Sequence, residues 1–188
     1  MLIKNTVFTG KCFSNIRQCN DFYATEPVAI KVLLEKETFS NVWECASGQG
    51  HLADELQKNN ILARKSDIVD MTDDTEILDF LSDDITEWEG DIITNPPFKH
   101  SQQFVEKALD IIPIGNKVAM FLKLSFLESV SRKKLFDRKD LKLVLIPRHR
   151  INCAKNGDFQ KYKSSAVCYA WFIFEKGYNK LPTIDWIY

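Results

Sequence analysis

The sequence of 188 residues lacks the features that mark disulfide-rich, metal-binding and membrane proteins. Its five cysteines are scattered and form no Cys-x-x-Cys pair, so neither a disulfide framework nor a zinc site is indicated. The three histidines are far apart and match no metal-ligand pattern, so no metal is expected. No apolar run approaches the roughly 20 residues that span a bilayer, and the N-terminus does not resemble a signal segment. We therefore expect a soluble, cytoplasmic protein without a membrane partner.

Glycine and proline are also scarce, at 7 and 6 residues, which excludes collagen-like and low-complexity chains. With 45% hydrophobic and 27% charged residues, the composition is that of an ordinary globular protein. The length suits one compact domain of about 100 to 200 residues. We expect residues 1–188 to form a single domain that is a monomer or a weak dimer.

Charge is distributed unevenly along the chain, although the net charge is only -1. Residues 1–95 hold 8 Lys and Arg against 18 Asp and Glu, whereas residues 96–188 hold 17 basic against 8 acidic residues. A basic half of this kind is typical of a protein that faces a polyanion such as nucleic acid. Charge alone is equally compatible with a solvated surface that binds nothing.

The hydrophobic pattern alternates between strands and helices. Short apolar, β-favouring runs predict strands at residues 41–46, 61–68, 91–94, 117–124, 141–146 and 166–174. Helical spacing predicts helices at residues 26–36, 51–59, 102–111 and 131–136, and a short helix or turn at 75–81 that leads into an extended segment. The alternation predicts an α/β fold with a mostly parallel sheet flanked by helices. The last two strands are predicted to form an antiparallel terminal pair, joined by a polar loop at residues 148–164.

The carboxyl ends of the first two predicted strands carry the features of a nucleoside site. Glu44, Gly48 and Gly50 follow the first strand, where glycines permit a tight turn and a close approach of the backbone to a ligand. Asp67 ends the second strand, where a carboxylate can accept hydrogen bonds from both ribose hydroxyls. Each feature alone fits a plain turn or a surface acid, but together they favour a ligand site.

The tetrapeptide at residues 95–98 ends the predicted strand at residues 91–94 and carries the sharpest chemical signal. The Asn95 side-chain oxygen and the Pro96 carbonyl can each accept one N–H of an amino group, which makes the nitrogen a better nucleophile. Pro96 and Pro97 stiffen the backbone, and Phe98 offers a flat face for a base taken out of its stack. A proline-terminated strand would explain the prolines but does not require Asn95 and Phe98.

These motifs resemble those of the S-adenosylmethionine-dependent amino-methyltransferases, in particular small phage-type enzymes that form N6-methyladenine in DNA. Residues 95–98 match their catalytic Asn-Pro-Pro-aromatic motif, and residues 44–50 match their cofactor glycine motif. Residues 21–27 are similar to a Tyr-x-Thr-Pro-Pro type segment that covers the methionine end of the cofactor, with Glu26 in place of the first proline. The resemblance covers residues 21–125 and implies a Rossmann-like class I methyltransferase fold.

The resemblance implies S-adenosyl-L-methionine as the cofactor and direct transfer of its methyl group to the N6 amino group of adenine in DNA. The implied catalytic residues are Asn95, Pro96, Pro97 and Phe98. The implied cofactor-binding residues are Tyr23, Thr25, Glu44, Ala46, Gly48, Gly50, Asp67, Asp79 and Phe80. Asp79 and Phe80 are expected to lie against the adenine of the cofactor.

No separate target-recognition domain is expected, so loops of the single domain would contact DNA. The basic residues predicted to bind phosphates are Arg132, Lys133, Arg148, Arg150, Lys155, Lys161 and Lys163. The alternative for each is a solvated surface charge.

Rival functions are methylation of an RNA adenine or a protein glutamine, because the tetrapeptide can hold any planar amine or amide. A catalytically silent nucleic-acid-binding module is a further alternative. The basic second half favours nucleic acid over protein, and the intact tetrapeptide argues against the silent module.

Overall fold

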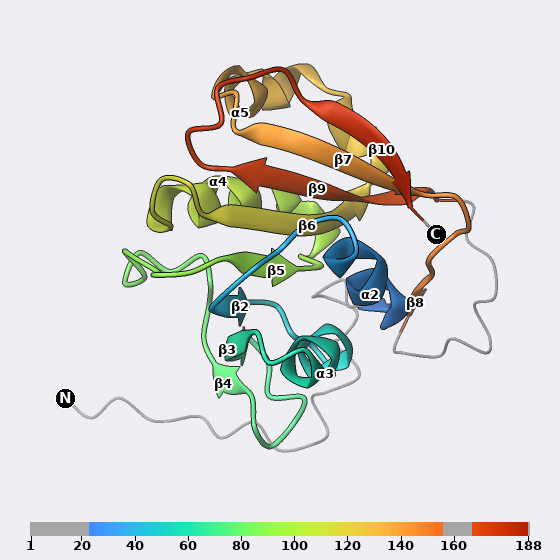
Figure 1. Cartoon of the computed structure of the whole chain (residues 1–188). Helices are drawn as coiled ribbons and strands as arrows, with labels where there is room; N and C mark the ends of the chain where they lie inside the picture. Colours follow the sequence, from blue (N-terminus) through green and yellow to red (C-terminus); the bar gives the residue numbers. More distant parts are fainter. Residues whose placement is uncertain (1–22, 156–166, 188) are drawn as a thin grey trace.

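The sheet dominates the computed structural model, which describes residues 23–155 and 167–187 (Figure 1). In spatial order, its eight strands are β10 (Thr183–Ile187), β7 (Leu141–Pro147), β9 (Tyr169–Glu175), β6 (Lys117–Lys123), β5 (Ile92–Thr94), β2 (Val42–Glu44), β3 (Leu62–Asp67) and β4 (Glu76–Ile77). A separate antiparallel pair consists of β1 (Tyr23–Thr25) and β8 (Cys153–Lys155). The helices are α2 (Val28–Leu34), α3 (His51–Lys58), α4 (Ser101–Ile111) and α5 (Lys133–Asp137), with 3-10 turns at Phe98–His100, Leu124–Leu127 and Val130–Arg132.

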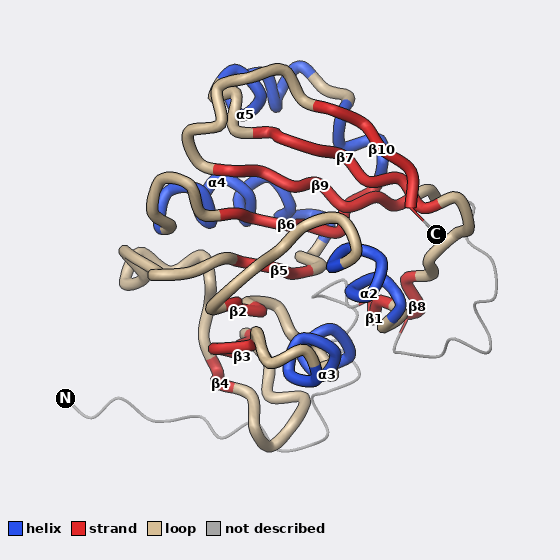
Figure 2. The backbone as a smooth tube through the Cα atoms, viewed as in Figure 1, coloured by secondary structure: helices blue, strands red, loops and turns tan. Residues whose placement is uncertain are grey.

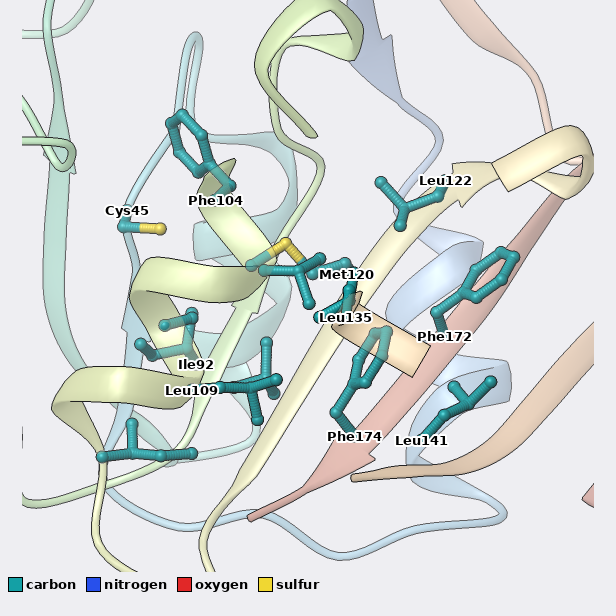
Figure 3. Packing of buried hydrophobic residues seen from close by; sticks show 14 of the residues in the cluster. Cys45, Ile92, Phe104, Leu109, Met120, Leu122, Leu135, Leu141, Phe172 and Phe174 are labelled. Atoms are coloured by element: carbon teal, nitrogen blue, oxygen red, sulfur yellow. The ribbon is translucent and has the colours of Figure 1, made fainter. Parts of the chain in front are cut away.

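The helices cover both faces of the sheet, as expected for an α/β fold (Figure 2). Neighbouring residues of a strand point to opposite faces, so Ile93 packs with α2 and α3 whereas Ile92 packs with α4. Figure 3 shows the α4 face, where Leu109 lies beside Ile92 in one cluster of buried side chains that also includes Met120 and Phe172. Each fully buried side chain of this size contributes roughly 1.5–3 kcal/mol relative to an exposed one. No helix in the two described ranges is long and apolar enough to cross a membrane.

The predicted strands and the antiparallel pair are confirmed, with one correction at the end of the sheet. β9 runs antiparallel to both of its neighbours, β6 and β7, while the remaining pairings in the sheet are parallel. However, β9 is neither the last strand nor at the edge, because β10 adds to β7 in parallel. The hydrophobic pattern missed β10 because Ile184 and Trp186 are about half exposed and only Ile187 is buried.

Two loop predictions are also corrected. Within residues 75–81, Glu76 and Ile77 form the edge strand β4 rather than a helix, since the adjacent edge of β3 offers backbone partners. Residues 82–90 contain turns and irregular backbone and no strand. Within the predicted loop at residues 148–164, Cys153–Lys155 forms β8 and pairs with β1.

The parallel strands all end at the same edge of the sheet, and this edge carries the candidate site. β2 and α3 are joined by the glycine turn, and β3 ends at Asp67. β5 ends one residue before Asn95, and β7 leads into Arg148 and Arg150. Ligands of open α/β sheets bind in crevices at this edge.

Candidate active site

A cavity of about 280 Å³ lies at the carboxyl ends of β2, β3 and β5. It brings together residues that are far apart in the sequence. Ten predicted site residues line it: Thr25, Glu44, Ala46, Asp67, Asp79, Phe80, Asn95, Pro96, Pro97 and Phe98. The predicted nucleoside features and the predicted amine-binding tetrapeptide therefore face one space.

The glycine turn forms the start of α3 beside this cavity. Gly50 is the N-cap residue with a φ of 85°, and Gly48 has a φ of 52°. Residues with a side chain rarely adopt this left-handed backbone conformation, which explains glycine at both positions. The wall itself is formed by the neighbours Ser47, Gln49 and His51, so the glycines shape the turn rather than line the cavity.

Asp67 is held in place by the backbone of the glycine turn. One carboxylate oxygen accepts a hydrogen bond from the Gly48 amide at 2.8 Å, and the other accepts one from the Val69 amide at 3.0 Å. Burial raises the pKa of Asp67, while hydrogen bonds from backbone amides oppose the rise. Each carboxylate oxygen has a further lone pair, so the side chain can still accept hydrogen bonds from a ligand.

Glu44 is the most deeply buried acidic group of the cavity wall. Its residue is 1% exposed, and neither carboxylate oxygen makes a hydrogen bond of normal geometry to the described residues. Burial raises the pKa of Glu44 to about 8, because the nearby Thr94 hydroxyl and Ala46 amide offset the loss of water only in part. The Ser47 hydroxyl is likewise buried without a hydrogen-bond partner among the described residues. Buried acceptors of this kind suit a ligand that brings a cationic donor.

The pair at residues 79 and 80, predicted to lie against the adenine of the cofactor, lines the cavity. Phe80 is 2% exposed and packs against Trp43 and Phe104, with ring centroids 5.3 and 5.0 Å away. The Asp79 carboxylate accepts a hydrogen bond from the Leu81 amide. Ile68, which the sequence prediction omitted, also lines the cavity and is 56% exposed. The signal for Ile68 was an apolar side chain directly after the acid that ends β3.

The tetrapeptide at residues 95–98 forms another part of the cavity wall. The Asn95 side-chain nitrogen donates a hydrogen bond to the Thr25 hydroxyl at 2.8 Å. The Phe98 ring lies 5.4 Å from the ring of Tyr169, and the Lys123 ammonium lies 4.5 Å from the centre of the Phe98 ring. Tyr169 and Lys123 stand opposite each other on β9 and β6. The sequence prediction assigned neither residue to the site, because strand pairing alone brings them to Phe98.

The cysteine thiols near the cavity are poor nucleophiles. Burial raises the pKa of Cys45 well above its usual value, and the neighbouring Glu44 charge raises it further. Burial also raises the pKa of Cys153 to about 12. Because only a thiolate attacks readily, both side chains stay protonated and unreactive near neutral pH.

The basic residues predicted to bind phosphates have different surroundings. Arg148 and Arg150 are exposed and follow β7 at the cavity edge of the sheet. Arg132 lies over the Phe126 ring, and Lys133 forms an ion pair with Asp137, so both have contacts of their own. Lys155 lies in β8, where its backbone pairs with Tyr23 of β1. Lys161 and Lys163 lie outside the described residues.

The structure resembles solved structures of methyltransferases. A proposed class I S-adenosylmethionine-dependent methyltransferase from Listeria monocytogenes superposes with a TM-score of 0.55 and 12% identity, over 99% of this chain and 68% of the other. The fold is that of the class I methyltransferases. The modification subunit of a proposed type I restriction enzyme from Vibrio vulnificus YJ016 shares it, with a TM-score of 0.55, 12% identity and coverage of 92% and 48%.

A proposed hemolysin from Streptococcus thermophilus has the same fold, with a TM-score of 0.55, 12% identity and coverage of 84% and 67%. No protein-family model matches the sequence, and no curated protein is significantly similar to it. At these identities the likeness establishes the class I methyltransferase fold and leaves the reaction to be argued from the site.

Proposed function

We propose that this protein is an S-adenosylmethionine-dependent methyltransferase that modifies the N6 amino group of adenine in DNA. The observation that carries the proposal is the shared cavity. It joins the buried Glu44 carboxyl group, which has no hydrogen bond of normal geometry to the described residues, to the predicted amine acceptors at Asn95 and Pro96. A cation-binding pocket beside two amine acceptors is the arrangement that methyl transfer from a sulfonium donor to an amino group requires.

The residues around the glycine turn fit the cofactor. Glu44 and Ser47 offer buried acceptors for its α-ammonium group, and the fixed Asp67 carboxylate can accept hydrogen bonds from ribose hydroxyls. Ile68 provides an exposed apolar surface for adenine, with Phe80 buried behind it in the same wall. When bound, the cofactor supplies a methyl group that its positively charged sulfur has already activated.

The chain's own contribution to the reaction is to hold and activate the amine. The Asn95 side-chain oxygen and the Pro96 carbonyl would each accept one N–H, which reduces delocalisation of the nitrogen lone pair into the base. Phe98 would stack with the extruded base and fix its plane. No covalent enzyme intermediate is needed, which agrees with the protonated state of the Cys45 and Cys153 thiols.

Three cations support a nucleic acid over a protein substrate. Lys123 lies against Phe98, and Arg148 and Arg150 extend the basic character along the same edge of the sheet. A nucleotide brings its phosphate close to the site together with its adenine base, whereas a glutamine brings no negative charge. The fold shared with a modification subunit of a restriction enzyme also suits a DNA substrate.

The proposal is tested by incubating the purified protein with methyl-labelled cofactor and, in parallel, with amplified unmethylated DNA, RNA or a protein mixture. We expect label in DNA only, and digestion to nucleosides should yield N6-methyl-2′-deoxyadenosine. Label in RNA or protein would show that the substrate is RNA or protein instead of DNA. Cofactor binding without any methyl transfer would indicate a catalytically silent binding module. Activity should fall steeply with salt, because phosphate contacts release counterions.

Replacing Phe98 by leucine is expected to lower kcat/KM for DNA by about 10- to 100-fold, because stacking of a base on an aromatic ring contributes about 1–3 kcal/mol. Phe98→Tyr keeps the flat face and should remain within about threefold of the wild type. Phe136→Leu is the matched control, since Phe136 packs with the core cluster on the α4 face. Equal kcat/KM values for Phe98→Leu and the wild type would contradict the stacking role.

A further inference from the structure

We propose that Thr25 is a positioning residue that orients the side-chain amide of Asn95, rather than a cofactor contact as its sequence motif suggests. The inference rests on the proposed function, since it assigns Asn95 the role of amine acceptor. Thr25 lies 70 positions before Asn95 in the sequence, and the proposal gives it a part in orienting the amine acceptor.

The contact itself is short and buried. Thr25 is 3% exposed and lies at the end of β1, and its hydroxyl oxygen accepts a hydrogen bond from the Asn95 side-chain nitrogen at 2.8 Å. This distance is well inside the normal range for an N–H···O hydrogen bond, which is about 2.7–3.2 Å. Both side chains line the cavity, so the hydrogen bond is formed at the site itself.

The orientation matters because the two ends of an asparagine amide have opposite chemistry. The oxygen only accepts hydrogen bonds and the NH₂ group only donates them. A half-turn of the Asn95 amide would place N–H groups toward the N–H groups of the substrate amine, and binding would be lost. Engaging the nitrogen end with Thr25 keeps the oxygen, with its two lone pairs, as the acceptor for the amine.

The position of Thr25 is fixed because β1 pairs with β8. In the β1–β8 pair, Thr25 is directly across from Cys153, whose sulfur is 3.9 Å from the Thr25 hydroxyl and 4.0 Å from the Asn95 side-chain nitrogen. The next residue, Glu26, accepts hydrogen bonds on its carboxylate from the Asn152 backbone amide at 3.1 Å and side-chain amide at 3.2 Å. The Glu26 amide donates to the Asn152 carbonyl in return, at 3.3 Å.

These contacts also separate the two roles that Thr25 could have. Glu26, which replaces a proline of the expected motif, accepts hydrogen bonds from Asn152 and does not line the cavity. The hydroxyl of Thr25 is likewise directed to Asn95, the proposed amine acceptor, and to Cys153 of β8. The segment at residues 23–26 therefore supports the amine acceptor, and the loop after β7 supports that segment.

The test compares Thr25→Val, which keeps the shape and removes the hydroxyl, with Thr25→Ser, which restores the hydroxyl. We expect Thr25→Val to lower kcat on DNA by about tenfold or more, the effect of losing one buried hydrogen bond, with a change below about twofold in the Kd of the cofactor. Thr25→Ser should recover most of kcat. The exposed strand residue Thr183 provides the matched control, Thr183→Val, which should leave both quantities unchanged.

A raised Kd of the cofactor with an unchanged kcat in Thr25→Val would overturn the proposal and restore the cofactor role. An unchanged kcat and Kd would overturn it as well. If Thr25→Val does not fold, as judged by its thermal transition, Thr25→Ala is measured in its place and the same outcomes decide.

A second readout does not depend on activity. The side-chain NH₂ signals of Asn95 are identified in a ¹⁵N-edited NMR spectrum as the pair missing from Asn95→Asp. In Thr25→Val these signals should shift and exchange faster with water, and in Thr25→Ser they should return. Unshifted signals would refute the hydrogen bond even if the wild type methylates nothing, whereas shifted signals in an inactive wild type would refute only the proposed function.

Discussion

Replacing Asn95 by alanine is expected to lower kcat on DNA by at least about 100-fold, with the Kd of the cofactor within about twofold of the wild type. Removing a single preorganised hydrogen-bonding group from a reacting centre typically costs about 100- to 1,000-fold in kcat. Asn95 contacts Thr25 and follows β5, whereas the turn at residues 46–50 that is proposed to hold the cofactor follows β2. The loss should therefore fall on the reacting amine and spare cofactor binding.

Steady-state assays with labelled cofactor measure kcat, and calorimetric titration measures the Kd. Asn59→Ala serves as the matched control, because Asn59 is an exposed asparagine at the end of α3 that does not line the cavity. An Asn95→Ala variant with wild-type kcat would remove the proposed mechanism entirely. Loss of cofactor binding in that variant would instead assign Asn95 to the cofactor pocket.

The sequence predicted the parts of the site that depend on local backbone geometry. Gly48 and Gly50 mark a turn with positive φ angles, and Asn95 follows directly where prolines end a strand. Because the carboxyl ends of parallel strands meet at one edge, a correct strand order by itself brings these residues to one cavity. Local signals and the rules of parallel sheets were therefore sufficient for this part.

The unpredicted parts of the site all depend on contacts between distant segments. Thr25 reaches Cys153 only because β1 pairs with β8, and each of these two strands, at three residues, is too short to carry a local signal of that pairing. Lys123 and Tyr169 meet at Phe98 through the register of β6 and β9, whose apolar sequences indicate burial but not which residues stand opposite each other. A side chain whose role is set by register is invisible to a pattern read along the chain.

Replacing Glu44 by glutamine is expected to change protein stability and cofactor affinity in opposite directions. The folded-state pKa of Glu44 is about 8, against an ordinary value of 4.5, because burial disfavours the charged form. The stability that this group contributes is complete below pH 4.5 and is lost as the pH rises to about 8, since only the unfolded chain releases the proton readily in that window. Glutamine cannot ionise, so the variant should gain a few kcal/mol over the wild type between pH 5 and pH 8.5, at about 1.4 kcal/mol per unit of pKa.

Cofactor affinity should fall, because glutamine cannot provide the negative charge that the α-ammonium group would meet. A hydrogen bond to a charged partner contributes about 1.5–3 kcal/mol, so the Kd at pH 7.5 should rise by about 10- to 100-fold. Urea unfolding of the cofactor-free protein at pH 5 and 8.5 measures the first effect, and calorimetry measures the second. Glu55→Gln is the matched control, because Glu55 is buried in α3 and pairs with Lys58 outside the cavity wall. A Glu44→Gln variant that is more stable at pH 8.5 yet binds the cofactor as tightly as the wild type would contradict the proposed role. It would show that Glu44 is a destabilising buried acid that does not contact the cofactor.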